Sequence, residues 1–384
     1  MIPYGRQHID EADIQAVVDT LRSDWLTQGP AIERFERAVA QRCGVADAVF
    51  VCNATAALHI ACLAAGLGPG DRLWTSANTF VASANCALYC GADVDFVDID
   101  PGTLNMSLPA LREKLERAQR QGALPKVVVP VAFAGQSCDL RGMRALADEY
   151  GFTLIEDASH AIGARYAGEP VGSNAFADMT VFSFHPVKII TTGEGGMVLV
   201  RDAATAEHLR RLRSHGITRD PAAMQGPSEG GWYYQQIELG FNYRATDLQA
   251  ALGLSQLAKL EGFVERRRQL AERYSCLLAE AGIGLPQPQA LAESAWHLYV
   301  VQVPAPRRRA IFDALRAAGI GVNVHYHPVH LQPWYRRLGF AEGDFPQAEA
   351  CYQRSISLPL YADLTDAAQD QVVAALLGAL EHAA

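Results

Sequence analysis

The first two thirds of the chain alternate short β-rich runs with stretches in which apolar residues recur at helical spacing. This alternation is typical of a parallel sheet with helices on both faces. Seven runs rich in β-branched or aromatic residues are predicted as strands, namely Ala48–Cys52, Arg72–Thr75, Val94–Asp98, Lys126–Val131, Thr153–Glu156, Met179–Phe184 and Gly196–Val200. The pattern therefore predicts an α/β fold around a mostly parallel, seven-stranded sheet.

Two amphipathic stripes precede the first predicted strand. One begins after Asp10 and places apolar residues at positions 14, 17, 18 and 21, and the other, Ile32, Phe35 and Val39, ends at Gly44. Both are predicted as helices that face the core. The stretch 25–30 between them contains a Gly-Pro break and fits either a binding loop or a plain connector.

The pattern changes after about Leu254. We expect a long charged helix from Gln256 to about Ala281 and a proline-rich connector over 284–288. A strand, a helix and a strand are expected to follow, around Leu298–Val303, Arg307–Ala318 and Gly321–His325. These elements suggest a large domain formed by residues 1–254, including the N-terminal segment, and a smaller α+β domain formed by residues 255–384.

Composition narrows the possible partners. Hydrophobic residues make up 49% and charged residues 20% of the chain, as in folded, water-soluble proteins, and the formal net charge is −9. An acidic balance argues against broad binding to nucleic acid or to an anionic membrane. The sequence has no signal pattern, no apolar run of membrane-spanning length and no CxxC pair among its eight cysteines. We therefore expect a cytoplasmic protein with reduced thiols and with no nucleic acid or membrane partner.

A carboxylate and a lysine follow two of the predicted strands. Asp157 comes directly after Thr153–Glu156, and Lys188 lies just past Met179–Phe184. Pyridoxal phosphate (PLP) chemistry needs a lysine amine that binds the aldehyde and a carboxylate that keeps the pyridine nitrogen protonated. Lysines are usually solvated and an Asp at a strand end often caps a turn, so either residue alone carries little weight. Together, and beside a phosphate site, they predict a PLP enzyme.

The phosphate site is predicted where the first strand runs into an alanine-rich helix, at residues 51–58. The N-terminus of a helix offers free N–H groups and the positive end of the helix dipole. Thr55 and Ala56 would donate main-chain N–H groups, the Thr55 hydroxyl would add a contact, and Ser183 could add another hydroxyl. An ordinary Asn or Thr helix cap would leave the same pattern.

Several segments together resemble the DegT/DnrJ/EryC1/StrS family of sugar aminotransferases, which are fold type I PLP enzymes. The similarity runs from Tyr4 to about Thr365 and is carried by Leu26–Gly29, Asn53–Leu58, Thr79–Asn85, Glu156–Ala161, Ser183–Gly196, Arg213–Gly216, Gly240–Arg244 and Val324–Tyr326. The resemblance implies the fold type I architecture, PLP as the cofactor and transamination as the reaction. It assigns to Lys188 and Asp157 the catalytic roles that their chemistry suggests.

The resemblance implies further cofactor contacts. Phe80 would stack on the cofactor ring. His160, where many relatives have Gln, would contact the ring hydroxyl and join Lys188 and Asp157 among the catalytic residues. Asn242 would reach the phosphate of the neighbouring subunit's cofactor, so that two chains share each site and a homodimer is the expected assembly.

Substrate contacts are implied in the same way. They fall on Tyr4, on the loop Asp24, Trp25, Leu26 and Thr27, and on the segment Asn323, Val324, His325 and Tyr326, with Arg213, His215 and Arg244 as further candidates. His325, His327 and His330 lie close together in sequence, but the Cys or carboxylate partners typical of a zinc site are missing. No metal is expected.

Within the family, the segments around His160, Lys188, Gly253 and His325 are most similar to the C-4 transaminases of pseudaminic acid biosynthesis. This similarity implies transfer of the amino group of L-glutamate to the C-4 ketone of UDP-2-acetamido-2,6-dideoxy-β-L-arabino-hexos-4-ulose, giving UDP-4-amino-4,6-dideoxy-N-acetyl-β-L-altrosamine. Two alternatives stay open, namely transamination of another nucleotide-linked keto-sugar and a catalytically silent protein with the same fold. Relatives that dehydrate sugars carry His where Lys188 stands, which argues against that reaction.

Overall fold

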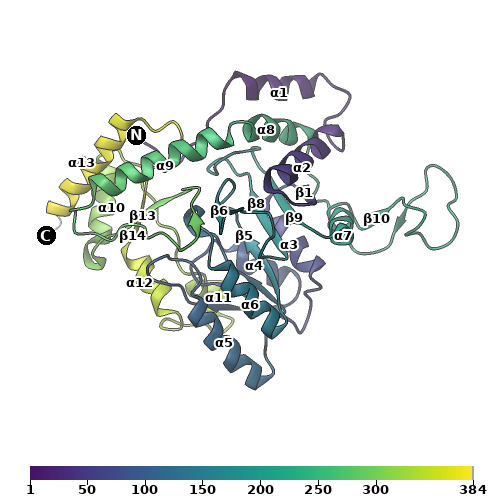
Figure 1. Ribbon diagram of the computed structural model, residues 1–384, viewed down its shortest axis with the longest axis horizontal. Helices are drawn as coiled ribbons and strands as arrows, with labels where there is room; N and C mark the ends of the chain where they lie inside the picture. Colours follow the sequence, from purple (N-terminus) through teal and green to yellow (C-terminus); the bar gives the residue numbers. More distant parts are fainter. Residues whose placement is uncertain (383–384) are drawn as a thin grey trace.

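A seven-stranded sheet forms the centre of the protein, as the computed structural model of residues 1–382 shows (Figure 1). Its strands are β1 (Asp47–Val51), β2 (Arg72–Ser76), β3 (Asp93–Val97), β4 (Val127–Val129), β5 (Thr153–Asp157), β8 (Met179–Ser183) and β9 (Gly196–Val200), in the order β1-β9-β8-β5-β4-β2-β3. Within this sheet only β9 runs against its neighbours, β1 and β8. The prediction of an α/β fold around a mostly parallel sheet of seven strands is therefore confirmed.

Helices cover both faces of the sheet. They are α2 (Pro30–Cys43), α3 (Ala54–Ala64), α4 (Ala82–Tyr89), α5 (Leu108–Gln121), α6 (Leu140–Tyr150), α7 (Ala203–Arg213) and α8 (Asp247–Leu257). Because successive side chains of a strand point to opposite faces, Val49 packs with α3, α4 and α7, whereas Phe50 packs with α2 and α8. On the α2 side, Val128 and Leu154 pack against α5 and α6. The sheet is thus buried on both faces, as parallel sheets require.

The C-terminal part of the chain packs around a core of its own. The helices α9 (Leu260–Leu277), α10 (Arg308–Ala317) and α13 (Asp366–His382) pack against one face of the antiparallel pair β13 (Tyr299–Gln302) and β14 (Ser355–Leu358). The short helices α11 (Pro333–Arg336) and α12 (Pro346–Arg354) lie between β13 and β14 in sequence, and β6 (Arg165–Tyr166), β7 (Glu169–Pro170) and β12 (Ala292–Glu293) form a small separate sheet. The domain boundary expected after residue 254 falls inside α8 and stays a prediction.

The first helix, α1 (Glu11–Leu21), does not face the core as predicted. Ile14 and Leu21 are 47% and 57% exposed, whereas its buried residue is Asp13. The Asp13 carboxylate accepts hydrogen bonds of 2.7 Å from Gln256 Nε2 and Lys259 Nζ. A buried carboxylate needs such partners. The helix lies along α8 (Figure 1). Its Asp13 is bound to Gln256 of α8, whereas Ile14 and Leu21 of the apolar stripe are exposed.

Two predicted C-terminal elements also differ. The long helix expected from Gln256 to about Ala281 is α9, which begins at Leu260 and ends at Leu277, because the chain turns at Ala258 and Lys259 after α8. No strand forms at Gly321–His325. Its backbone makes only scattered bonds, from Gly321 N–H to the Ile2 carbonyl at 2.6 Å and across a single bridge to Ser357, and β14 is the partner of β13 instead.

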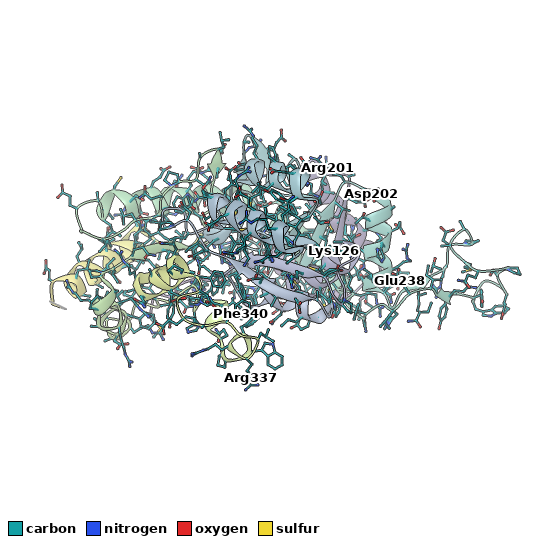
Figure 2. The ribbon with its side chains drawn as sticks, turned by 90° about the horizontal axis from the view of Figure 1, so that it is seen from below. Lys126, Arg201, Asp202, Glu238, Arg337 and Phe340 are labelled. Carbon is teal, nitrogen blue, oxygen red and sulfur yellow. The ribbon has the colours of Figure 1, made fainter. Side chains whose placement is uncertain are left out.

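An arm leaves the body between α7 and α8. It contains the short antiparallel pair β10 (Ile217–Thr218) and β11 (Gln235–Gln236), and the loop between these strands projects away from the rest of the molecule (Figures 1 and 2), with Glu238 at its base. Trp232 and Leu239 on this arm are 76% and 79% exposed. Within residues 1–382 no helix is both long and apolar enough to cross a membrane.

Candidate active site

A cavity of about 560 Å³ opens where the strands of the sheet end. The carboxyl ends of parallel strands meet at one edge, and ligands of α/β proteins bind there. The predicted site residues that line this cavity are Tyr4, Thr55, Phe80, Asp157, His160, Ser183, Lys188, Asn323, Val324, His325 and Tyr326. The fold therefore brings together residues that are spread over most of the chain.

Asp157, the last residue of β5, is fixed by three hydrogen bonds. Its Oδ2 accepts from Ser83 Oγ at 2.7 Å, and its Oδ1 accepts from the N–H of Ser159 at 3.1 Å and from Ser159 Oγ at 2.5 Å. The residue is 5% exposed and lines the cavity. These donors hold the carboxylate in one orientation at the cavity, and a carboxylate can pair with a protonated ring nitrogen.

Lys188 lies in the loop 184–195 that connects β8 to β9. Its N–H donates to the His185 carbonyl at 2.9 Å, and the loop is closed by a bond of 3.0 Å from Thr192 N–H to the Phe184 carbonyl. Burial lowers the pKa of the Lys188 amine to about 8, against the opposing effect of the negative Asp157. A lysine with a lowered pKa is neutral, and so nucleophilic, at a lower pH than an exposed one.

The first turn of α3 has free N–H donors at the cavity wall. Asn53 caps this helix, and its Oδ1 accepts from the N–H of Ala56 at 2.8 Å. The N–H of Ala56 is thus engaged by the cap, and Ala56 is not among the residues that line the cavity. Its contact with a phosphate stays a prediction. Ala54 and Thr55 line the cavity, and their N–H groups have no hydrogen-bond partner within residues 1–382. These two N–H groups and the Thr55 hydroxyl fit a phosphate.

His160 is neutral and turned toward Tyr326. Its Nδ1 accepts from the N–H of Ala134 at 3.3 Å, so the proton sits on Nε2, which donates to Tyr326 Oη at 3.2 Å. Burial, together with the charge of Lys188, holds the pKa of His160 well below its usual value. Phe80 presents a ring that is 57% exposed, 6.2 Å from the ring of Tyr326. An exposed aromatic face in a cavity is suited to stack on a flat ligand.

Tyr4 and the segment 323–326 form a part of the cavity wall that is polar but uncharged. Burial lowers the pKa of His325 to about 4 and raises that of Tyr4. His325 Nδ1 bonds to Ser357 Oγ at 2.8 Å, and the rings of Tyr4 and His325 lie 5.6 Å apart. This wall can therefore donate and accept hydrogen bonds, as a sugar requires, without presenting a net charge.

Other predicted residues lie outside the cavity of their own chain. The loop Asp24–Thr27 and Asn242 are exposed. The loop is tied to the start of α8 by a bond of 3.0 Å from Asp247 N–H to the Leu26 carbonyl. Arg213 is bound outside this cavity, because its Nη1 lies 2.5 Å from Oε1 of Glu36.

Sequence reasoning missed several lining residues. His297 is 5% exposed, and its ring lies 4.3 Å from that of His160. Burial and the neighbouring His160 lower its pKa well below the usual value. A lone histidine ahead of a predicted strand carries no signal of this role. Glu194 also lines the cavity. Nothing in the sequence of the Thr79–Asn85 segment indicates that Ser83 donates a hydrogen bond to Asp157.

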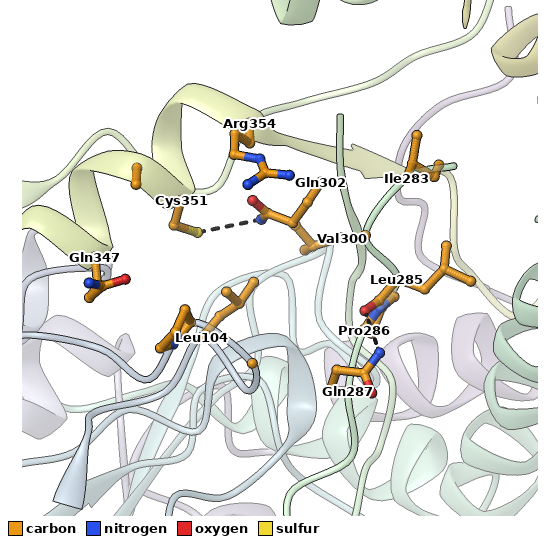
Figure 3. Close-up of a pocket in the computed structure, with 14 residues that line it drawn as sticks. Leu104, Ile283, Leu285, Pro286, Gln287, Val300, Gln302, Gln347, Cys351 and Arg354 are labelled. Atoms are coloured by element: carbon orange, nitrogen blue, oxygen red, sulfur yellow. Dashed lines mark hydrogen bonds between the residues drawn. The ribbon is translucent and has the colours of Figure 1, made fainter. Parts of the chain in front are cut away.

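A second cavity, of about 520 Å³, lies between the loop 101–104, the connector 283–287 and α12 (Figure 3). Gln302 Nε2 donates to Cys351 Sγ there at 3.6 Å, and Arg354 is the charged residue of the lining. No lysine or carboxylate lines this cavity, so it lacks the pair that the first one holds. Within residues 1–382 no cluster of three His, Cys, Asp or Glu side chains could hold a metal ion.

Comparison with known proteins agrees with this geometry. A model of the DegT/DnrJ/EryC1/StrS aminotransferase family matches residues 7–377. The spore coat polysaccharide biosynthesis protein SpsC of Bacillus subtilis is 40% identical over 382 residues, which cover 98% of this chain and 96% of SpsC.

Solved structures extend the comparison. Spr1654 of Streptococcus pneumoniae in its PMP form matches with a TM-score of 0.91 and 31% identity over 100% of both chains, and its PLP form is also similar. Helicobacter pylori PseC, an aminotransferase involved in the biosynthesis of pseudoaminic acid, matches with a TM-score of 0.89 and 30% identity over 99% of both chains. The chain therefore belongs to the DegT/DnrJ/EryC1/StrS aminotransferase family and is a PLP-dependent sugar aminotransferase.

Proposed function

We propose that the protein moves the amino group of L-glutamate to the C-4 ketone of UDP-2-acetamido-2,6-dideoxy-β-L-arabino-hexos-4-ulose, as in pseudaminic acid biosynthesis. The observation that carries a transaminase role is the placement of Lys188 and Asp157 in one cavity beside free N–H groups. The specific sugar is supported by the resemblance of the site segments and by the similarity to PseC.

Each residue then has a defined task. Bound PLP supplies an aldehyde that exchanges amino groups and a ring that accepts the electrons of a broken C–H bond. Lys188 holds this group and, once its amine is free, moves a proton from Cα of glutamate and later delivers one to C-4 of the sugar. Asp157 holds the positive charge of the ring nitrogen. Thr55 and Ser183 contact the phosphate, and Phe80 and His160 hold the ring.

The sugar is proposed to bind against Tyr4 and the segment Asn323–Tyr326. The polar, uncharged character of this wall supports a glycosyl ligand, because hydroxyl and acetamido groups need both donors and acceptors. The loop Asp24–Thr27 and Asn242 are proposed to enter the site of a partner chain. The exposed apolar residues of α1 and of the arm support such a homodimer. The eight free cysteines are consistent with our proposal that the protein works in the cytoplasm.

A second candidate is transamination of a different nucleotide-linked keto-sugar. The observation that favours it is the 40% identity to SpsC, a spore coat polysaccharide biosynthesis protein.

We predict that, with L-glutamate as the donor, the UDP-linked 4-keto sugar gives a kcat/KM at least about tenfold above that of dTDP-linked, GDP-linked and 3-keto analogues, since binding pockets discriminate sugars by several hydrogen bonds. Product formation against this panel, measured by mass spectrometry, checks the prediction. A higher kcat/KM for another carrier or ketone position would establish the second candidate instead.

The pH dependence of cofactor capture tests the environment of Lys188. The amine attacks the aldehyde only when neutral, so a pKa of about 8 shifts covalent capture of PLP by the cofactor-free protein to a midpoint near pH 8 rather than 10.5. Asp157→Asn removes a charge that raises this pKa, and its midpoint is expected at still lower pH. Stopped-flow absorbance provides the measurement, with Lys188→Ala as the control that captures nothing covalently. A midpoint near the ordinary lysine value would contradict this environment.

Subunit complementation tests the shared site. Lys188→Ala and Asn242→Ala chains are each expected to be nearly inactive, because each loses one half of every site. Mixed and refolded together in equal amounts, they should recover about a quarter of the wild-type activity, since half of the dimers are mixed and each holds one intact site. If the mixture stays as inactive as its components, Asn242 and Lys188 act within the same chain.

A further inference from the structure

Hydroxyl groups from two distant parts of the chain hold Asp157. Ser159 follows it directly after β5, whereas Ser83 belongs to α4 and lies 74 positions earlier. Thr79, in the loop before α4, places its Oγ1 2.8 Å from Ser83 Oγ. Thr79, Ser83 and Asp157 are 1%, 0% and 5% exposed, so bulk water has little access to their hydrogen bonds.

Proton counting fixes the direction of this chain of hydroxyls. Ser83 has a single hydroxyl hydrogen, and that hydrogen goes to the Asp157 carboxylate, because an ionised carboxylate only accepts. Thr79 must then be the donor to Ser83 Oγ. The result is a directed relay from Thr79 through Ser83 to Oδ2 of Asp157. Hydrogen bonds that follow one another in this way strengthen each other.

The neighbouring Glu156 lies in a different environment. Its side chain points to the other face of the sheet, where Oε1 accepts from Ser137 Oγ at 2.8 Å. Burial, and to a smaller extent the charge of Asp157, raises the pKa of Glu156 to about 7. Asp157, which faces the cavity, accepts three hydrogen bonds, one from Ser83 and two from Ser159.

We propose that Ser83 is a positioning residue for transamination, which holds the Asp157 carboxylate in one orientation, with Thr79 as its support. Ser83 binds Oδ2 of Asp157 and Ser159 binds Oδ1, while Asp157 itself lines the cavity. The inference rests on the proposed role of Asp157 at the ring nitrogen. Ser83 acts through Asp157 and does not itself line the cavity.

The test uses the PLP-loaded enzyme and its first half-reaction with L-glutamate, followed as a single turnover by visible absorbance. Ser83→Ala is expected to slow this step about ten- to a hundredfold, the effect of losing one hydrogen bond to a charged group. The loss should appear in the rate constant at saturating glutamate and not in the Kd for glutamate, because Ser83 lies outside the cavity lining. Ser83→Thr keeps the hydroxyl and should restore most of the rate.

Two further variants sharpen the test. Thr79→Val should slow the half-reaction less than Ser83→Ala does. Combined with Ser83→Ala it should slow the half-reaction no further, because both residues act through one relay. Ser355→Ala removes another fully buried, hydrogen-bonded serine that lies outside the cavity lining, and its rate should match the wild type.

The outcomes separate this inference from the proposed function. If Asp157→Asn is inactive while Ser83→Ala has the wild-type rate, the role of Ser83 is refuted and that of Asp157 stands. A slowed Ser83→Ala that the Ser83→Thr variant does not match with a restored rate also refutes it, since a loss that the hydroxyl does not restore is the signature of a packing defect. If Asp157→Asn retains the full rate, the proposed role of Asp157 fails, and this inference with it.

Discussion

The register between β5 and β8 is the constraint on which the site depends. These strands run parallel, with Asp157 opposite Val181. The end of β5 therefore lies beside the last residues of β8, which lead into the loop that carries Lys188. Because side chains alternate between faces, Asp157 enters the cavity while Glu156 turns to the opposite face. A slip of one residue would exchange the two carboxyl groups. Burial of both sheet faces by helices prevents that slip, since it would move the apolar residues of each face out of the clusters in which they pack.

Burial also sets the charges inside the cavity. His160, His297 and His325 all have lowered pKa values, chiefly because they are removed from water. These imidazoles are neutral near pH 7, so the positive charge of the site is left to Lys188 and to the cofactor. The Asp157 carboxylate, held by its donors, then has a clear electrostatic partner. The burial that lowers the pKa of Lys188 also lowers the pKa values of the three histidines, so these do not add a second positive charge beside it.

Much of this arrangement was predictable from the sequence. Strand positions follow from local β-rich runs, and Asp157, Lys188 and Thr55 follow from the chemistry of residue types at strand ends. The errors have a common physical cause, because local pattern does not say what an element packs against. The stripe of α1 predicts a buried helix, yet Asp13 decides how it docks. The Gly321–His325 segment has strand-like composition but contacts the N-terminal Ile2, and His297 reaches the site only through tertiary packing.

The central claim is that Lys188 holds PLP in this cavity and that the bound cofactor takes the amino group of glutamate. It is tested most directly by the visible absorption spectrum of the purified protein, supplemented with PLP, before and after addition of L-glutamate alone. The account predicts a yellow protein whose visible band is lost on adding glutamate, with one equivalent of 2-oxoglutarate released per chain. A colourless protein that takes up no PLP, or a yellow one whose band is unaffected by glutamate, would contradict it.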